Sequence, residues 1–201
     1  MMKFDEKKLI LNLEMLSPRK RLAFSVAAAS RIINNYGFYS KKVNLVDSTA
    51  INTMESLWAA VLDNSIEHKK WESILSILLN LIPEENTNWT IWHALIDDAI
   101  SSLAYAIRCM LTSSSQEAAW AARRAYEAAD QVVCRLTDLE LAHDREVKIL
   151  SHPLIQRELE RQTRDLNVLR IGVEEESIQK LYEMSKVELL YIDGEENNYK
   201  S

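Results

Sequence analysis

The stretch WTIWHALIDDAISSLAYAIRCML, residues 89–111, decides the fold expected for this chain. Trp92, Ile96, Ala99 and Leu103 recur at spacings of three and four residues, so they share one face of a helix. The opposite face is also largely apolar, and the segment contains neither Gly nor Pro. A helix that is apolar nearly all round is usually enclosed by other helices. We therefore expect residues 89–111 to form the central helix of a helical bundle.

The rest of the 201-residue chain also has the composition of an all-α domain. It contains three Gly and three Pro, which are too few for the many turns of a sheet or barrel protein. Helical periodicity predicts further helices, at about 6–15, 17–34, 48–61, 67–81, 115–136, 153–170 and 174–190. We expect an all-α, single-domain bundle of about eight helices over residues 1–190, followed by a polar C-terminal tail at 191–201.

The ends of the second expected helix have recognisable signals. Ser17 and Pro18 are typical of an N-cap and a first helical residue. Gly37 suits a left-handed C-terminal cap, so we expect residues 38–46 to form a loop. Farther along, residues 137–150 have a weak pattern that predicts one or two short helical turns.

The same helix carries three cations in its first turn, Arg19, Lys20 and Arg21. The helix dipole disfavours positive charge at that end. Two interpretations remain open. Either the cations serve a binding role, or solvent tolerates them at a small cost in stability, and we favour the second.

The net charge of −6 is distributed unevenly along the chain. Residues 1–42 carry nine basic and three acidic residues, whereas residues 43–107 carry two basic and nine acidic ones. Phosphate charge dominates nucleic-acid binding, so the acidic middle disfavours a nucleic-acid partner and suits a basic protein. The simpler interpretation, a solvated surface that keeps the protein soluble, stays open.

Features of export or membrane insertion are missing from the sequence. The first residues lack the apolar region of a signal peptide, and no run reaches the roughly 18 apolar residues of a membrane span. Cys109 and Cys134 fall in apolar helical segments and form no CxxC motif or Cys/His cluster, so we expect buried thiols. We therefore expect a cytoplasmic protein with no membrane partner.

One pair of residues is suited to metal chemistry. His93 and Asp97 are four residues apart and share a face of the expected central helix. A metal site would need a third ligand, which Glu158 or Glu160 could supply from a later helix. The structural alternative, which we favour, is that each side chain hydrogen-bonds to a neighbour. The chain has no Gly-rich phosphate loop and no GxSxG motif, so we expect no cofactor and no enzymatic activity.

Candidate partner-binding residues gather in the acidic middle of the chain. They are Asp47, Glu55, Asp63, Glu67, Glu72, Glu84, Glu85 and Trp89. An aromatic residue beside acids is a good interface anchor, which gives Trp89 a possible binding role. The structural alternative for Trp89 is a hydrophobic staple onto the start of the central helix.

Several spaced motifs resemble the YjaG-like proteins of bacteria. They are Leu13-Glu14-x-Leu16, Tyr36-Gly37-Phe38, Pro83-Glu84 ahead of Leu95-Ile96-Asp97, and Pro153 with Glu158 and Gln162. The resemblance spans roughly residues 10–170. It departs in the alanine-rich segment 115–136 and at His93-Ala94, where the family pattern suggests Tyr-Pro. The resemblance implies an all-helical domain without an assigned activity, and it supplies no catalytic residues.

Together these features predict a non-enzymatic protein-binding protein. The sharpest hypothesis is a bacterial immunity protein that neutralises a cognate basic toxin by direct binding. One alternative is a cryptic metal-binding or enzymatic protein that uses His93 and Asp97. Another is a housekeeping homo-oligomer with a regulatory role, and the sequence leaves a monomer and a homodimer both open.

Overall fold

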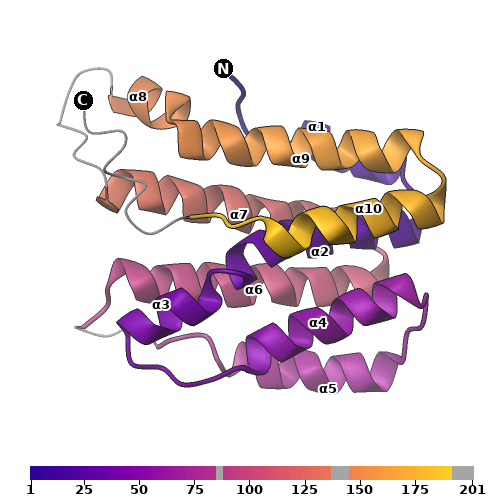
Figure 1. The fold of residues 1–201 in the computed structure, drawn as a ribbon, viewed down its shortest axis with the longest axis horizontal. Helices are drawn as coiled ribbons and strands as arrows, with labels where there is room; N and C mark the ends of the chain where they lie inside the picture. The colour runs from indigo at the N-terminus through magenta and orange to yellow at the C-terminus, as the bar shows by residue number, and fades with distance from the viewer. Residues whose placement is uncertain (85–87, 137–144, 192–201) are drawn as a thin grey trace.

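All of the regular structure found in this chain is helical. The computed structural model describes residues 1–84, 88–136 and 145–191, and within them the chain forms ten helices and no strand (Figure 1). The helices are α1 (Glu6–Glu14), α2 (Pro18–Ile33), α3 (Tyr36–Lys42), α4 (Thr49–Leu62), α5 (His68–Leu79), α6 (Ile91–Thr112), α7 (Ser115–Leu136), α8 (Arg145–Ser151), α9 (Pro153–Ile171) and α10 (Glu174–Val187). The predicted all-α bundle is therefore confirmed.

Helix α6 has the central place that its sequence predicts. It packs against α2, α3, α4, α5 and α7, and Figure 1 shows it between the α4–α5 layer and the α7 layer. Its side chains Leu95, Ile96, Leu103 and Ile107 are fully buried. Burying such a side chain stabilises the fold by about 1.5–3 kcal/mol relative to leaving it in water, so α6 contributes much of the core energy.

Alanine side chains let α7 approach α6 closely. Ala118, Ala122 and Ala125 are fully buried, and the hydroxyl of Ser102 donates to the carbonyl of Ala121 at 2.9 Å. The two helices run antiparallel because a short turn at Ser113, which adopts φ 56°, joins them. This arrangement is the one expected from the short connection.

The prediction of a loop at residues 38–46 is wrong over its first part. Residues 36–42 form α3, and Gly37 lies inside this helix; the residue with positive φ is Asn44, at 57°, after the helix ends. Tyr36 and Tyr39 are fully buried, so aromatic packing against the core outweighs the low helix propensity of Gly37.

Two other expectations, for residues 137–150 and for the C-terminal tail, also need adjustment. In the weak segment, residues 145–151 form α8, whereas 137–144 lie outside the described residues. Tyr191, expected in the polar tail, is buried at 1% exposure.

Cys109 is buried and Cys134 is half-buried, and both are free thiols. Among the described residues, no helix combines the length and apolarity needed to cross a membrane.

The cations in the first turn of α2 have a structural role that we did not expect. Arg19 donates to the carbonyls of Val61 at 3.0 Å and Leu62 at 2.8 Å, which end α4. Lys20 donates to the carbonyl of Gly172 at 2.8 Å, where α9 ends. Cations favour helix C-termini, so the charge that is misplaced for α2 is well placed for its neighbours.

Arg21 extends the same arrangement to two more helix ends. Its guanidinium donates to the carbonyls of Leu13 at 3.0 Å and Leu16 at 3.2 Å, next to the end of α1. It also donates to the carbonyl of Ser113, the C-cap residue of α6. Three consecutive cations thus join the C-terminal ends of α1, α4, α6 and α9 to the start of α2.

Candidate functional sites: an acidic edge and a buried arginine cluster

His93 and Asp97, the pair considered for metal chemistry, hydrogen-bond to different residues. The Nδ1 atom of His93 accepts from the backbone N–H of Thr90 at 3.1 Å and lies 2.9 Å from its hydroxyl. Asp97 instead accepts from the hydroxyl of Ser101 at 2.9 Å. Each side chain therefore hydrogen-bonds to a neighbour on its own helix, as the structural alternative proposes.

The acids nominated as a third metal ligand are also placed elsewhere. Glu158 is 1% exposed and paired with Arg31, and Glu160 is exposed on α9. In the part of the chain that the structure describes, no group of three or more His, Cys, Asp or Glu side chains is arranged to hold a metal ion. The candidate ligands on α6 and α9 thus do not converge.

The nominated acidic residues divide into separate groups. Asp47 is half-buried and accepts from the backbone N–H of Thr49 at 2.8 Å, so it supports the start of α4. Glu55 is exposed and faces a cavity between α4 and α10. Glu85 lies outside the described residues.

The other nominated acids follow the outer edge of the bundle. Asp63 and Glu67 lie at the turn between α4 and α5, Glu72 lies on α5, and Glu84 follows the far end of that helix; all four are exposed. Since α5 has 12 residues, it spans about 18 Å, and the acids form a line instead of a compact patch.

Exposed apolar side chains accompany the acids along α5. Ile66, Ile77 and Leu79 have exposures of 41%, 55% and 46%. The opposite face of α5 is turned inward and buries Trp71 and Leu78. We define the α5 edge surface as Ile66, Glu67, Glu72, Ile77 and Leu79. Exposed apolar residues rimmed by charges are typical of protein interaction surfaces.

Trp89 packs against the first turn of α6. Its ring is half-buried and stacks on the ring of His93, with the centroids 5.6 Å apart and an interplanar angle of 27°. This contact is close to the staple that we offered as the structural alternative, although the partner residue lies in the first turn of the helix instead of the second.

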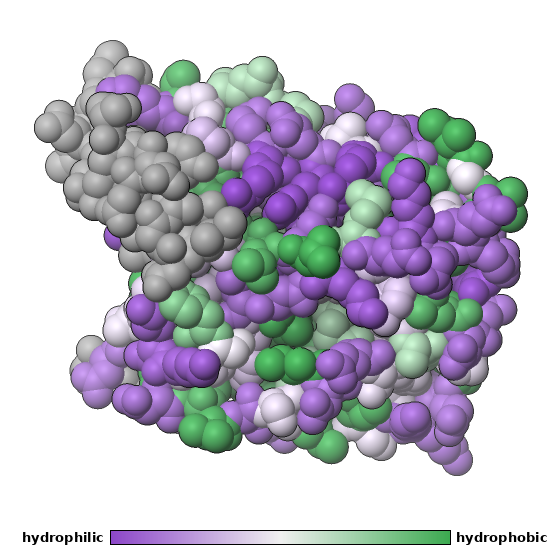
Figure 2. All heavy atoms as spheres, viewed as in Figure 1, coloured by the Kyte–Doolittle hydropathy of each residue, from purple (hydrophilic) through white to green (hydrophobic). Residues whose placement is uncertain are grey.

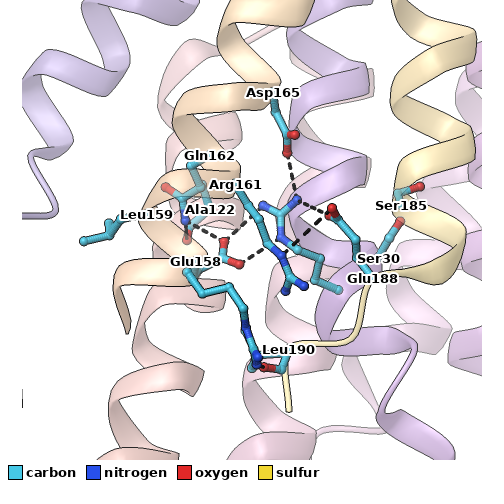
Figure 3. A network of polar contacts seen from close by, with 12 residues as sticks. Ser30, Ala122, Glu158, Leu159, Arg161, Gln162, Asp165, Ser185, Glu188 and Leu190 are labelled. Carbon is cyan, nitrogen blue, oxygen red and sulfur yellow. Dashed lines mark hydrogen bonds and ion pairs between the residues drawn. The ribbon is translucent and has the colours of Figure 1, made fainter. Parts of the chain in front are cut away.

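Sequence reasoning missed the largest polar feature, a buried arginine on α2. Arg31 is fully buried and forms a two-pronged ion pair with Glu158 of α9, with Nε to Oε2 at 2.9 Å and Nη2 to Oε1 at 3.0 Å. Its Nη1 donates to Asp165 at 2.8 Å. Glu158 and Asp165 are two turns apart on one face of α9 and point toward the same place (Figure 3).

Further residues complete this arginine cluster. Gln162, between the two acids, donates from Nε2 to Glu158 at 2.8 Å and to the carbonyl of Ala122 at 3.0 Å. Arg164 donates to Asp165 at 2.6 Å and to Glu188 at 2.5 Å. Positive and negative groups thus alternate through the cluster, which is the arrangement that makes buried charge tolerable.

The electrostatics of the cluster favour the charged forms of Arg31 and Glu188. Burial by itself would lower the pKa of Arg31, but Glu158 and Asp165 raise it above the ordinary value. Burial by itself would raise the pKa of Glu188, but Arg164 and Arg31 lower it below the ordinary value. Arg31 and Glu188 are therefore both charged near neutral pH.

Three arginines on the outer side of the cluster bind the chain that follows α10. We call residues 188–191 the C-terminal strap. Arg157 and Arg161 donate to the carbonyls of Leu190 and Leu189, each at 2.7 Å, and Arg164 binds the carboxylate of Glu188. Spacings of four and three along α9 place the three guanidinium groups in register with consecutive strap residues.

The other side of the strap is bound by the end of α2. The backbone N–H of Leu190 donates to the carbonyl of Arg31 at 3.0 Å. Asn35 donates to the carbonyl of Tyr191 at 2.7 Å and accepts from its backbone N–H at 3.1 Å. The strap therefore covers the arginine cluster and joins α2 to α9.

A second buried acid lies on α6. Asp98 is 1% exposed and accepts from Arg124 at 3.1 Å and from Gln131 at 2.6 Å. Burial raises the pKa of Asp98 to about 7, Arg124 offsets part of this rise, and the neighbouring Asp97 and Glu127 add to it. Asp98 is thus the buried carboxyl in the described residues with the clearest capacity to titrate near neutral pH.

In the part of the chain that the structure describes, ten helices thus form an all-α bundle with a buried salt-bridge cluster. The sequence profile described as "Protein of unknown function (DUF416)" matches residues 8–188, and the chain belongs to this family. The chain is similar to a crystal structure of a DUF416 family protein from Shewanella baltica OS155, with a TM-score of 0.76 and 16% identity over 91% of this chain and 94% of that chain. At this identity the likeness concerns the fold. No curated protein matched the chain.

Proposed function

We propose that this protein binds a protein partner through the α5 edge surface, and that the partner is a basic toxin which it neutralises as a bacterial immunity protein. The observation that carries the proposal is the exposure of Ile77 and Leu79 on the same edge helix as Glu72. This edge carries Asp63, Glu67, Glu72 and Glu84 against Lys69 and Lys70, so its net negative charge attracts a basic surface.

In the proposed mechanism, charged residues increase the association rate and apolar residues slow dissociation. The acids would speed the encounter with a basic partner, since complementary charge mainly increases the association rate. Ile66, Ile77 and Leu79 would supply the lasting affinity, because desolvated apolar contacts at the centre of an interface slow dissociation. A toxin covered in this way would be blocked sterically, without a chemical step by this protein.

The other sequence-based hypotheses stay predictions. The metal-binding or enzymatic alternative has less support, because His93 and Asp97 are used in separate hydrogen bonds. The exposed side chains of Ile77 and Leu79 also support the homo-oligomer alternative, because a second copy of this chain could cover them. Light scattering that gives twice the monomer mass would favour this alternative. The narrower resemblance to the YjaG-like proteins concerns family membership, and it identifies no functional residue in this chain.

The proposal is tested with the product of the neighbouring gene, because toxin and immunity genes are usually adjacent. Co-expression should relieve any growth inhibition by that product, and the two proteins should co-purify. Reversing Glu67 and Glu72 to Lys should weaken the complex at least tenfold, mainly through slower association. Glu14→Lys, an exposed change on α1, is the matched control and should bind normally. A neighbouring product that is harmless and fails to bind would overturn the proposal.

A further inference from the structure

A cavity of about 560 Å³ lies between α2, α4 and α10 and is distinct from the α5 edge surface. Figure 2 shows hydrophobic side chains gathered where α4 and α10 meet. Ligand sites typically have volumes of roughly 300–1,000 Å³, with apolar and aromatic walls and a few polar groups that fix orientation. The volume and the lining of this cavity fit that description.

Aromatic and apolar groups form the floor of the cavity. Trp58 is 4% exposed, and its Nε1 donates to the hydroxyl of Ser30 at 2.8 Å. The rings of Trp58 and Tyr182 lie 5.3 Å apart at 53°, and the buried side chains Ile33 and Met54 complete the floor. Because the polar groups of Trp58 and Ser30 are bonded to each other, the floor presents mainly apolar contact to a ligand.

Charges of opposite sign stand on facing walls of the same cavity. Glu55 is exposed on α4, and Lys186 is exposed on α10 with its Nζ 4.4 Å from the ring centroid of Tyr182. The ion pairs of the described residues do not include one between Glu55 and Lys186. The hydroxyl of Tyr182 raises the pKa of Lys186, and Glu183 and then Glu55 add to the rise, so the ammonium form is favoured. The rim therefore offers one anion and one cation.

We propose that this cavity binds a free α-amino acid with an apolar or aromatic side chain. The ligand's ammonium group lies against Glu55, its carboxylate against Lys186, and its side chain on the floor formed by Trp58 and Tyr182. A zwitterion matches both rim charges at once, whereas a simple amine or a simple acid matches one and places its own charge near a group of the same sign.

The test titrates the full chain with L-phenylalanine and three related probes. Phenethylamine lacks the carboxylate, 3-phenylpropionate lacks the ammonium group, and glycine lacks the side chain. The readout is the indole N–H resonance of Trp58, assigned with a Trp58→Phe variant, with the resonance of buried Trp71 as an internal control. We expect saturable shifts of the Trp58 signal with phenylalanine and binding about tenfold weaker with each other probe.

Matched variants separate the two rim charges from general charge effects. Glu55→Gln and Lys186→Gln should each weaken phenylalanine binding about tenfold. The controls Glu72→Gln on α5 and Lys180→Gln on α10 make the same charge changes outside this cavity and should bind normally. Equal binding of phenylalanine and the singly charged probes would overturn the proposal, and so would the absence of saturation at millimolar concentrations. Neither result bears on toxin binding at the α5 edge surface.

Discussion

Arg31 of α2 and Glu158 of α9 lie 127 residues apart in the sequence and form a two-pronged ion pair in the interior of the protein, at 2.9 and 3.0 Å. The side chains are 0% and 1% exposed. A pair buried this deeply gains little net stability over apolar residues of the same shape, but each partner depends strongly on the other. The pair therefore fixes how α2 and α9 face each other.

Removing one member of the pair should be more damaging than removing both. Glu158→Met leaves the Arg31 guanidinium without its two-pronged partner, and we expect a loss of about 3–5 kcal/mol in the free energy of unfolding. Arg31→Met should cost a similar amount. The double substitution should cost much less than the sum of the single losses, as urea denaturation would measure. Additive losses would contradict the coupling inferred from the structure.

The C-terminal strap should be essential for stability. A chain that ends at Val187 loses Glu188 and the main-chain contacts of Leu190 and Tyr191. We expect its free energy of unfolding to fall by about 3 kcal/mol, because the arginine cluster then opens to water and loses one of its acids. A chain that ends at Tyr191 is the matched control. Thermal unfolding that gives equal midpoints for the two chains would rule out this role.

Asp98 predicts a specific dependence of stability on pH. Burial raises its pKa from 3.8 to about 7 in the folded protein, so ionisation is harder in the folded state than in the unfolded one. Its contribution to stability is therefore complete below about pH 4 and is lost as pH rises toward 7. Asp98→Asn should gain stability relative to the parent protein across this range and show no relative gain below it. Denaturation series at pH 4 and pH 8 measure the effect, with the exposed change Asp63→Asn as control.

Arg21 should be more important than its position in the first turn of α2 suggests. It donates to the carbonyls of Leu13, Leu16 and Ser113, which belong to two different helix ends. Arg21→Ala should lower the free energy of unfolding by about 2–3 kcal/mol, since charge-assisted hydrogen bonds of this kind are lost together. Lys7→Ala on α1 is a control on an exposed cation and should change stability by less than about 0.5 kcal/mol. Hydrogen exchange at the ends of α1 and α6 would locate the effect.

The candidate sites were predictable to different degrees. The acidic residues and their exposure follow from the sequence, because Glu72 falls on the polar side of an amphipathic helix and Glu67 lies at the start of that helix. The apolar half of the α5 edge surface was not nominated for partner binding, because the exposure of Ile77 and Leu79 depends on which helices pack beside α5. Glu55 could not be separated from the other acids, because its surroundings depend on where α10 packs.

The sequence by itself determined that this chain is an all-α bundle with α6 at its centre. Local physics is sufficient for that conclusion, because an apolar helix such as residues 91–112 must be covered on all sides. The helix start at Ser17 and Pro18 was determined in the same way, and the hydroxyl of Ser17 accepts from the backbone N–H of Lys20.

Only the tertiary structure decided the roles of the charged residues inside and between the helices. One signal was available, since Arg31 is a lone cation in the apolar run AFSVAAASRII, but its partners on α9 and in the strap are more than 120 residues away. The cations Arg19 and Arg21 were likewise misread as solvent-tolerated, because the carbonyls they bind belong to other helices. Periodicity defines which face of a helix is apolar, whereas the packing of the bundle defines which faces and ends meet.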